Sequence, residues 1–279
     1  LRILDGLDGP VLGEVPAISL HEDAPLYERP MAPPVDLATR QEDTPEGHLP
    51  ESNDVSEDLL SLMQSQEWIT SQYDSQLFLN TVAGPGSNAA VLRLKHPVSG
   101  EDTGRGLAVT TDGNHRWCAV DPKIGTAMTV AESMLNLACV GAEPRALVNC
   151  LNFGNPENPN VMWQLSEAVD GMAEACLQFN IPVVGGNVSL YNESQGKNID
   201  PTPIVGLIGV INNLKTPPPE VTWNEGDRLM VIGPPGKGLS GSAWAFAQNA
   251  RNGQLNKVDY EIHERVCQTV RMLVNQGLV

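Results

Sequence analysis

The sequence has few basic residues, few aromatic residues and no long apolar run. Seventeen Lys and Arg residues stand against 34 Asp and Glu residues, which gives a formal net charge of −17 at pH 7. A protein that binds a nucleic-acid backbone needs a basic stripe, so nucleic acid is not an expected partner. No apolar run of about 18 residues occurs, and we expect no membrane span. The acidity also argues against docking on an anionic membrane.

Paired cysteine motifs are absent too. The chain has five cysteines, an odd number, and no CxxC occurs. Most of them stand in apolar contexts, which is typical of reduced, buried thiols and not of a disulfide framework or a zinc site. We therefore expect a cytoplasmic protein. The first residue is Leu1 and no signal-peptide pattern follows it, so the chain is expected to come from within a longer product.

Common catalytic and phosphate-binding motifs are missing. The sequence contains no GxSxG, HExxH, GxxxxGK[ST] or GxGxxG. The histidines are scattered, and only His115 stands near a candidate site, where a surface-loop histidine is the more ordinary interpretation. The sequence alone therefore assigns no catalytic residue.

Strands and helices alternate along most of the chain. Because aromatic residues make up only 5%, the core is expected to be aliphatic and rich in alanine. The alternation predicts an α+β fold, a mixed β-sheet with helices packed on one face, followed by a truncated second α/β domain. The expected strands are 91–94, 107–110, 146–151, 181–184, 204–211 and 228–232. One expected helix begins at residue 56, with Ser56 as its cap. The other expected helices span 124–140, 161–179, 242–252 and 263–276.

Composition divides the chain into four parts. Residues 1–20 are too few to bury a core, and the acidic, proline-rich residues 21–56 are typical of a linker. Residues 57–216 hold most of the periodic pattern. After the Pro217–Pro219 break, residues 226–279 are expected to begin another domain.

The most informative motif is Val183–Glu193, VVGGNVSLYNE. A buried strand ends in two glycines, which allow backbone N–H groups to approach an anion closely. Asn187 and Ser189 then offer neutral oxygen ligands for a phosphate or its magnesium. The same residues are equally typical of a simple turn, since most of them are good turn formers.

Other polar motifs end or precede expected strands. Asn149–Pro156 (NCLNFGNP) can line a polar pocket or cap the next helix. Asp112 can bind a metal or form an Asx-turn. The small-residue loops at 84–90 and 233–242 resemble phosphate loops only loosely, and plain turns account for them as well.

Several segments together resemble one family, phosphoribosylformylglycinamidine synthase. Residues 110–132, 136–176, 181–193 and 201–211 are similar to its second synthase-type domain, in the same order and spacing. Residues 226–233 resemble the start of its companion C-terminal-type domain, and residues 13–30 the end of the first such domain with the linker after it. The resemblance therefore covers nearly the whole chain.

The resemblance implies a function and site residues. In this family, ATP phosphorylates the amide oxygen of formylglycinamide ribonucleotide, and glutamine-derived ammonia displaces the phosphate. Carried over by position, Asn149 and Gly186 would contact ATP, Asn187 would bind Mg²⁺ and Ser189 would contact the substrate. Asn149 and Asn88 stand where the family often has aspartate, which lowers the charge available to hold magnesium.

The resemblance also implies partners and leaves alternatives. The family works with a glutaminase subunit and a small bridging subunit, and its sheets pair between two halves. Its catalytic histidine motif lies in the amino-terminal half and does not occur here, so we expect the isolated chain to be inactive. The pairing of sheets implies a further partner, either that missing half or a second copy of this chain. The alternatives are a non-catalytic structural half that holds a nucleotide or has a degenerate site, and a small-molecule kinase of the same superfamily.

Overall fold

The computed structural model describes residues 1–44, 54–63, 65–220, 222 and 224–279. It divides into two compact units, Leu1–Pro30 and Met31–Val279. Each unit is described by itself.

The first unit is a small hairpin followed by a short helix. Strands β1 (Arg2–Leu4) and β2 (Val11–Glu14) pair antiparallel, and η1 spans Ala17–Leu20. Arg2 pairs with Glu14 across the hairpin at 2.8 Å. None of its large apolar side chains is buried, so the unit has no core, as the sequence predicts for so short a segment.

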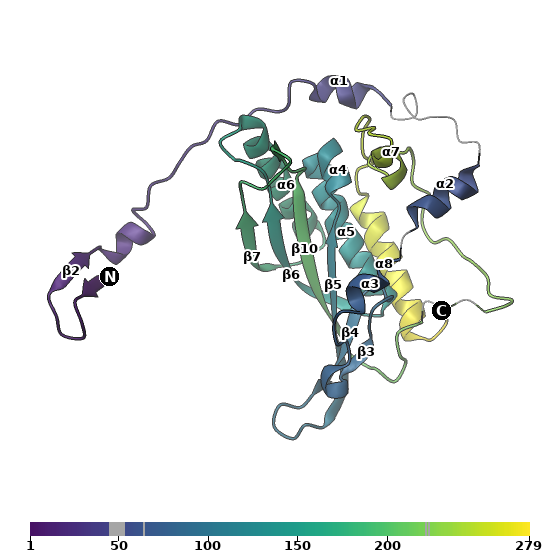
Figure 1. The fold of residues 1–279 in the computed structure, drawn as a ribbon. Coiled ribbons are helices and arrows are strands. Elements are labelled where there is room, and N and C mark those ends of the chain that lie inside the picture. The colour runs from purple at the N-terminus through teal and green to yellow at the C-terminus, as the bar shows by residue number, and fades with distance from the viewer. Residues whose placement is uncertain (45–53, 64, 221, 223) are drawn as a thin grey trace. The chain divides into compact units, whose positions relative to one another are not determined.

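The second unit is built on a six-stranded sheet in the order β3-β4-β5-β10-β6-β7 (Figure 1). The strands are β3 (Thr81–Ala83), β4 (Ala90–Lys95), β5 (Asp102–Gly113), β6 (Glu143–Asn152), β7 (Val183–Ser189) and β10 (Thr202–Ile211). Neighbours run antiparallel except β6 and β7, which are parallel. The predicted mixed sheet is confirmed, and β10, the last strand in sequence, lies at its centre.

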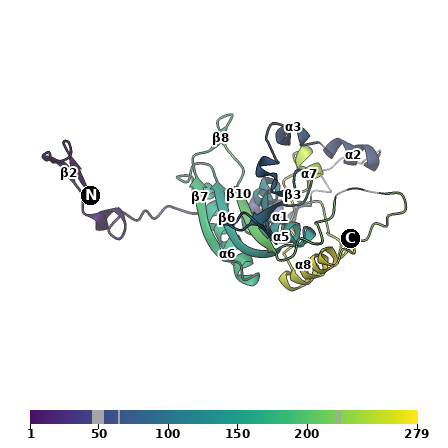
Figure 2. The same ribbon diagram turned by 90° about the horizontal axis from the view of Figure 1, so that it is seen from below.

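Helices cover one face of this sheet (Figure 2). Helix α5 (Pro122–Cys139) packs on β5 and β10, and α6 (Pro159–Gln178) and α8 (Tyr260–Asn275) pack on α5. Burial alternates along β10, where Val205 and Leu207 are fully buried towards the helices. The fold is α+β, as predicted. The remaining elements are α1 (Leu37–Glu42), α2 (Val55–Leu62), α3 (Glu67–Thr70), η3 (Leu77–Leu79), α4 (His115–Val120), α7 (Ala243–Ala247), and the hairpin of β8 (Glu193–Ser194) and β9 (Lys197–Asn198).

The core is aliphatic, as the scarcity of aromatic residues predicts. Phe153 is its one fully buried large aromatic side chain in the described part of the chain, and it sits among Leu, Val and Ala side chains of the sheet and α5. Gly141, with φ of +78°, ends α5 as expected, because a residue with a Cβ rarely adopts that conformation.

Three local predictions are wrong. Asp54, not Ser56, caps α2, because its carboxylate accepts from the backbone N–H groups of Ser56 and Glu57. Residues 228–232 form no strand, since no described strand pairs with them and a strand needs a partner for its backbone groups. The expected helix 242–252 is only α7, which ends where Asn249 turns to φ of +57°.

Candidate functional site

One edge of the sheet collects the polar motifs. Strands β5, β6 and β7 end at this edge, and β10 begins there because it runs antiparallel to β5 and β6. The segments 110–114, 149–155 and 187–193 therefore lie at the same end of a single sheet, although they are far apart in the sequence. This edge is the candidate site.

Asn149 on β6 and Gly186 on β7 are direct neighbours in the parallel register. A Cβ atom on Gly186 would overlap the Asn149 side-chain oxygen, so glycine is required for the side chain to keep this position. The Asn149 amide also lies 3.5 Å from the Met172 sulfur on α6. The pair thus faces the helical side of the sheet, and the Asn149 amide fills the space that a side chain at position 186 would need.

Asn187 and Ser189 point to the opposite face of β7, because side chains alternate along a strand. Asn187 pairs in register with Cys150, and its amide lies 3.8 Å from the Cys150 sulfur. Ser189 pairs with Asn152. The structure therefore brings the four predicted residues onto two adjacent strands, but divides their side chains between two faces.

The loop after β7 is held by side-chain amides. The Asn192 amide donates to the carbonyl oxygens of Phe153 and Ser189, at 3.0 and 2.9 Å. Ser189 Oγ lies 3.3 Å from Asn192 Oδ1. Tyr191, at φ of +59°, donates to Glu157 at 3.2 Å. These contacts fix the turn between the strand end and the β8–β9 hairpin, and so position Ser189.

Asp112 at the end of β5 is fully engaged within the protein. Its carboxylate accepts from Thr110 and Ser133 at 2.7 Å each and from Asn136 at 2.8 Å. Ser133 and Asn136 belong to α5, so this carboxylate ties the strand to the helix. These contacts are with side chains, not with the backbone of an Asx-turn, and the role as a metal ligand stays a prediction.

The loop at 84–90 meets the end of β5 at a cavity of about 450 Å³. Asn88 and Ser87 line it from the loop, and Thr110 and Asp112 from the strand. The loop closes on itself through Ser87 N–H to Gly84 O at 3.1 Å. Asn88 therefore shares a cavity with the carboxylate of Asp112.

A cluster of charged and aromatic side chains at the same edge was missed by sequence reasoning. Arg251 pairs with Asp200 at 2.7 Å and stacks over Phe246, with its Cζ 4.2 Å from the ring centroid. His115 meets Phe246 edge to face at 5.1 Å. Burial, followed by the charge of Arg116, lowers the pKa of His115. Residues from α4, α7 and the start of β10 converge only in the fold, so no local pattern reveals them.

Metal-binding potential at the edge rests on neutral oxygens. Among the described residues, no group of three or more His, Cys, Asp or Glu side chains is placed to hold a metal ion. Amide and hydroxyl oxygens are available at Asn187, Ser189 and Asn88, and such hard oxygen ligands suit Mg²⁺. In the second loop, residues 233–237 line a separate cavity of about 610 Å³ beside α5 and α8.

Comparison with known proteins matches this geometry to one family. Residues 86–211 match the family model "AIR synthase related protein, N-terminal domain". The whole chain is 42% identical to phosphoribosylformylglycinamidine synthase subunit PurL of Moorella thermoacetica, over 285 aligned residues. The chain is a homologue of part of this synthase subunit. It spans 38% of that relative's length.

Solved PurL structures share the fold. Thermotoga maritima PurL complexed with FGAR matches 96% of this chain and 36% of its own, with a TM-score of 0.59 and 25% identity. The same protein complexed with ATP matches 73% of this chain and 30% of its own, with a TM-score of 0.53 and 30% identity.

In the described residues, no helix is both long and apolar enough to cross a membrane.

Proposed function

We propose that this chain is the ATP- and substrate-binding half of a phosphoribosylformylglycinamidine synthase, acting as part of a longer protein. The reaction would join formylglycinamide ribonucleotide and glutamine-derived ammonia, with ATP activating the amide oxygen. The observation that carries the proposal is the register that puts Asn149 beside Gly186 and Asn152 beside Ser189. Homology over the whole chain to the PurL subunit supports it.

The residue roles are carried over by position from the family, and the residues lie on two faces of β7. On the helical face, the absence of a side chain at Gly186 lets the Asn149 amide lie against the β7 backbone, where this amide would contact ATP. On the opposite face, Asn187 would hold Mg²⁺ and Ser189 would contact the substrate. When bound, ATP with its magnesium supplies the phosphoryl group that activates the amide. Residues of this chain bind and orient these reactants.

The partners follow from the same proposal. The part of the synthase that carries the catalytic histidine, a glutaminase subunit and a small bridging subunit would complete the enzyme. A domain division at 57–216 and 226–279, with a linker at 21–56, belongs to this proposal, as does a cytoplasmic location. The isolated chain is expected to have no ligase activity.

Calorimetric titration with a non-hydrolysable ATP analogue, with and without magnesium, tests the proposal. We expect magnesium-dependent binding that is weakened in both Asn149→Ala and Gly186→Ala. Asn212→Ala is the matched control, because Asn212 lies just beyond the far end of β10. Binding that is equal in all variants would overturn the assigned site.

A non-catalytic half is the second candidate. It is favoured by the amides at Asn149 and Asn88, where relatives often carry carboxylates, and by the absence of an acidic cluster among the described residues. In that case the purified chain should retain ADP through gel filtration. Nucleotide released by acid and measured by chromatography would show this, and an empty protein that binds the analogue reversibly would favour the first candidate.

A further inference from the structure

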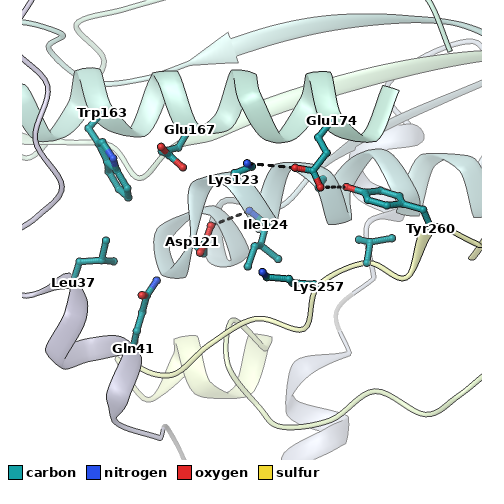
Figure 3. Close-up of a pocket in the computed structure, with 12 residues that line it drawn as sticks. Leu37, Gln41, Asp121, Lys123, Ile124, Trp163, Glu167, Glu174, Lys257 and Tyr260 are labelled. Carbon is teal, nitrogen blue, oxygen red and sulfur yellow. Dashed lines mark hydrogen bonds and ion pairs between the residues drawn. The ribbon is translucent and has the colours of Figure 1, made fainter. Parts of the chain in front are cut away.

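A third cavity lies beside helices α5 and α6 (Figure 3). Its volume is about 420 Å³, within the range of small-molecule sites. Its walls come from the start of α5, from α6, from α1, and from the beginning of α8 with the segment before it. The side chains that carry the argument are Gln41, Asp121, Trp163, Glu167 and Lys257.

The cavity is part of the packed structure. A Cβ on Gly171 of α6 would overlap the backbone carbonyl oxygen of Lys123 on α5, so these helices approach closely along one wall. The α1 wall is fastened by backbone bonds, from Gly253 N–H to Arg40 O at 2.7 Å and from Ala32 N–H to Pro159 O at 3.2 Å. The walls are thus held in place without a ligand.

One end of the cavity is neutralised internally. Lys123 pairs with Glu174 at 3.3 Å, and the Tyr260 hydroxyl donates to the same carboxylate at 3.3 Å (Figure 3). Burial and the Glu174 charge raise the pKa of Tyr260 to about 12, so this hydroxyl remains a donor. Because these two charges neutralise each other, this end offers no opposite charge to a charged group of a ligand.

The other end offers negative charge beside an aromatic ring. Trp163 and Glu167 project from α6 into the cavity, facing Asp121 and Gln41 (Figure 3). Asp121 uses Oδ1 to accept from Ile124 N–H at 2.8 Å. Glu167 has no ion pair or hydrogen bond with any residue in the described part of the chain. A half-buried carboxylate next to an indole ring suits an ammonium or guanidinium group.

Lys257 contributes the opposite charge at the rim. It is exposed, and within the described ranges it makes no ion pair. A ligand with only positive charge would be repelled by Lys257, and one with only negative charge by Glu167 and Asp121. A molecule with both charges complements all three groups.

We infer that this cavity binds a small zwitterion of the amino-acid class with a cationic side chain. The ammonium or guanidinium group lies between Trp163 and Glu167, and the carboxylate pairs with Lys257. The inference stands independently of the proposed function, since it involves none of the sheet-edge residues.

L-arginine is the probe, and agmatine, which lacks the carboxylate, separates the two ends. Binding is measured by calorimetry. We expect saturable binding of L-arginine, weakened about tenfold or more in Glu167→Gln, as the loss of a charge-assisted hydrogen bond predicts. Lys257→Gln should weaken the binding of L-arginine. The affinity for agmatine should stay the same or increase.

Matched controls are Asp170→Asn, an exposed acid three residues further along α6, and Lys95→Gln, an exposed lysine on β4. Thermal unfolding of each variant verifies that it folds. The inference fails if L-arginine does not saturate the protein, or if Glu167→Gln binds as tightly as Asp170→Asn. The ATP analogue is titrated separately, so failure at one site leaves the other test intact.

Discussion

The side-chain oxygen of Asn149 occupies the space beside Gly186 that a Cβ atom would need. The two residues are 37 positions apart (186 − 149) and meet only because β6 and β7 pair in parallel at this register. Each restricts the other, since a larger residue at 186 must displace the amide at 149.

Gly186→Ala should therefore act on binding more than on stability. The overlapping atom is the end of a side chain that can rotate away, so we expect a stability cost below about 1 kcal/mol. Binding of the ATP analogue should fall as far as in Asn149→Ala, and the double variant should lose no more than either single one. Additive losses in this double-mutant cycle would show that the residues act separately.

Gly171→Ala should be costly to stability. Here the overlapping atom is the backbone carbonyl oxygen of Lys123, which cannot move without shifting α5. We expect a loss of about 1–3 kcal/mol in the free energy of unfolding, measured by urea denaturation. Gly185→Ala is the control, because its nearest neighbour, Val148 Cγ1, is at an ordinary 3.8 Å. Equal losses for both would contradict the close helix packing described above.

Asp112→Asn should loosen the contact between β5 and α5. The carboxylate accepts three hydrogen bonds, and an amide in its place turns a donor towards one of those donors. The expected cost is about 1–3 kcal/mol, since Ser133 is fully buried and cannot reach water. The exposed Asp170→Asn should change the unfolding midpoint little, and a similar effect of both would argue against this role.

Acid should destabilise the protein through His263. Burial lowers its pKa, while its Nε2 donates to Ala131 O at 2.8 Å. The unfolded chain then binds the proton first, so stability falls as the pH drops below the ordinary histidine pKa of about 6.5. His263→Gln should make the melting temperature less dependent on pH between about pH 7 and 5. His115, whose pKa burial also lowers, accounts for part of the remaining slope.

The control for this prediction is His21→Gln, because His21 is exposed. It should leave the acid dependence as in the unaltered chain. A His263→Gln profile that falls as steeply as that of His21→Gln would contradict the prediction.

Most thiols should react slowly in the folded protein. Burial raises the pKa of Cys118 and Cys267 to about 12, and also raises that of Cys139 and Cys176. A thiol reagent at pH 8 should modify at most Cys150 quickly, and all five thiols after denaturation. Rapid modification of several thiols under native conditions would show that the core opens readily.

Local patterns in the sequence predict much of this fold because burial follows them. The continuous apolar run over 204–211 matches β10, and the helical spacing over 161–179 matches α6. The turn at Gly141 follows from glycine's tolerance of positive φ. Residues 228–232 have the same apolar character, yet they remain irregular, because strand formation depends on a partner that a local pattern does not reveal.

The candidate site could be predicted only in part. The motifs at 149–155 and 183–193 identify which segments are polar at strand ends. They do not reveal that Gly186 and Asn187 serve opposite faces, nor that Asp112 is already occupied by α5. The Arg251–Asp200 pair joins residues 51 positions apart across α7 and β10, so only the tertiary structure shows it.

The central position of β10 sets the order in which this sheet can form during synthesis. Residues 204–211 pair with 106–113 of β5 on one side, and 202–210 pair with 143–152 of β6 on the other. Until β10 leaves the ribosome, the edges of β5 and β6 that it will join remain unpaired, and both edges are rich in apolar residues. Such late, non-local pairing slows folding and exposes the nascent chain to aggregation. The cell's synthesis rate and chaperones therefore bear on how much of this protein reaches its folded state.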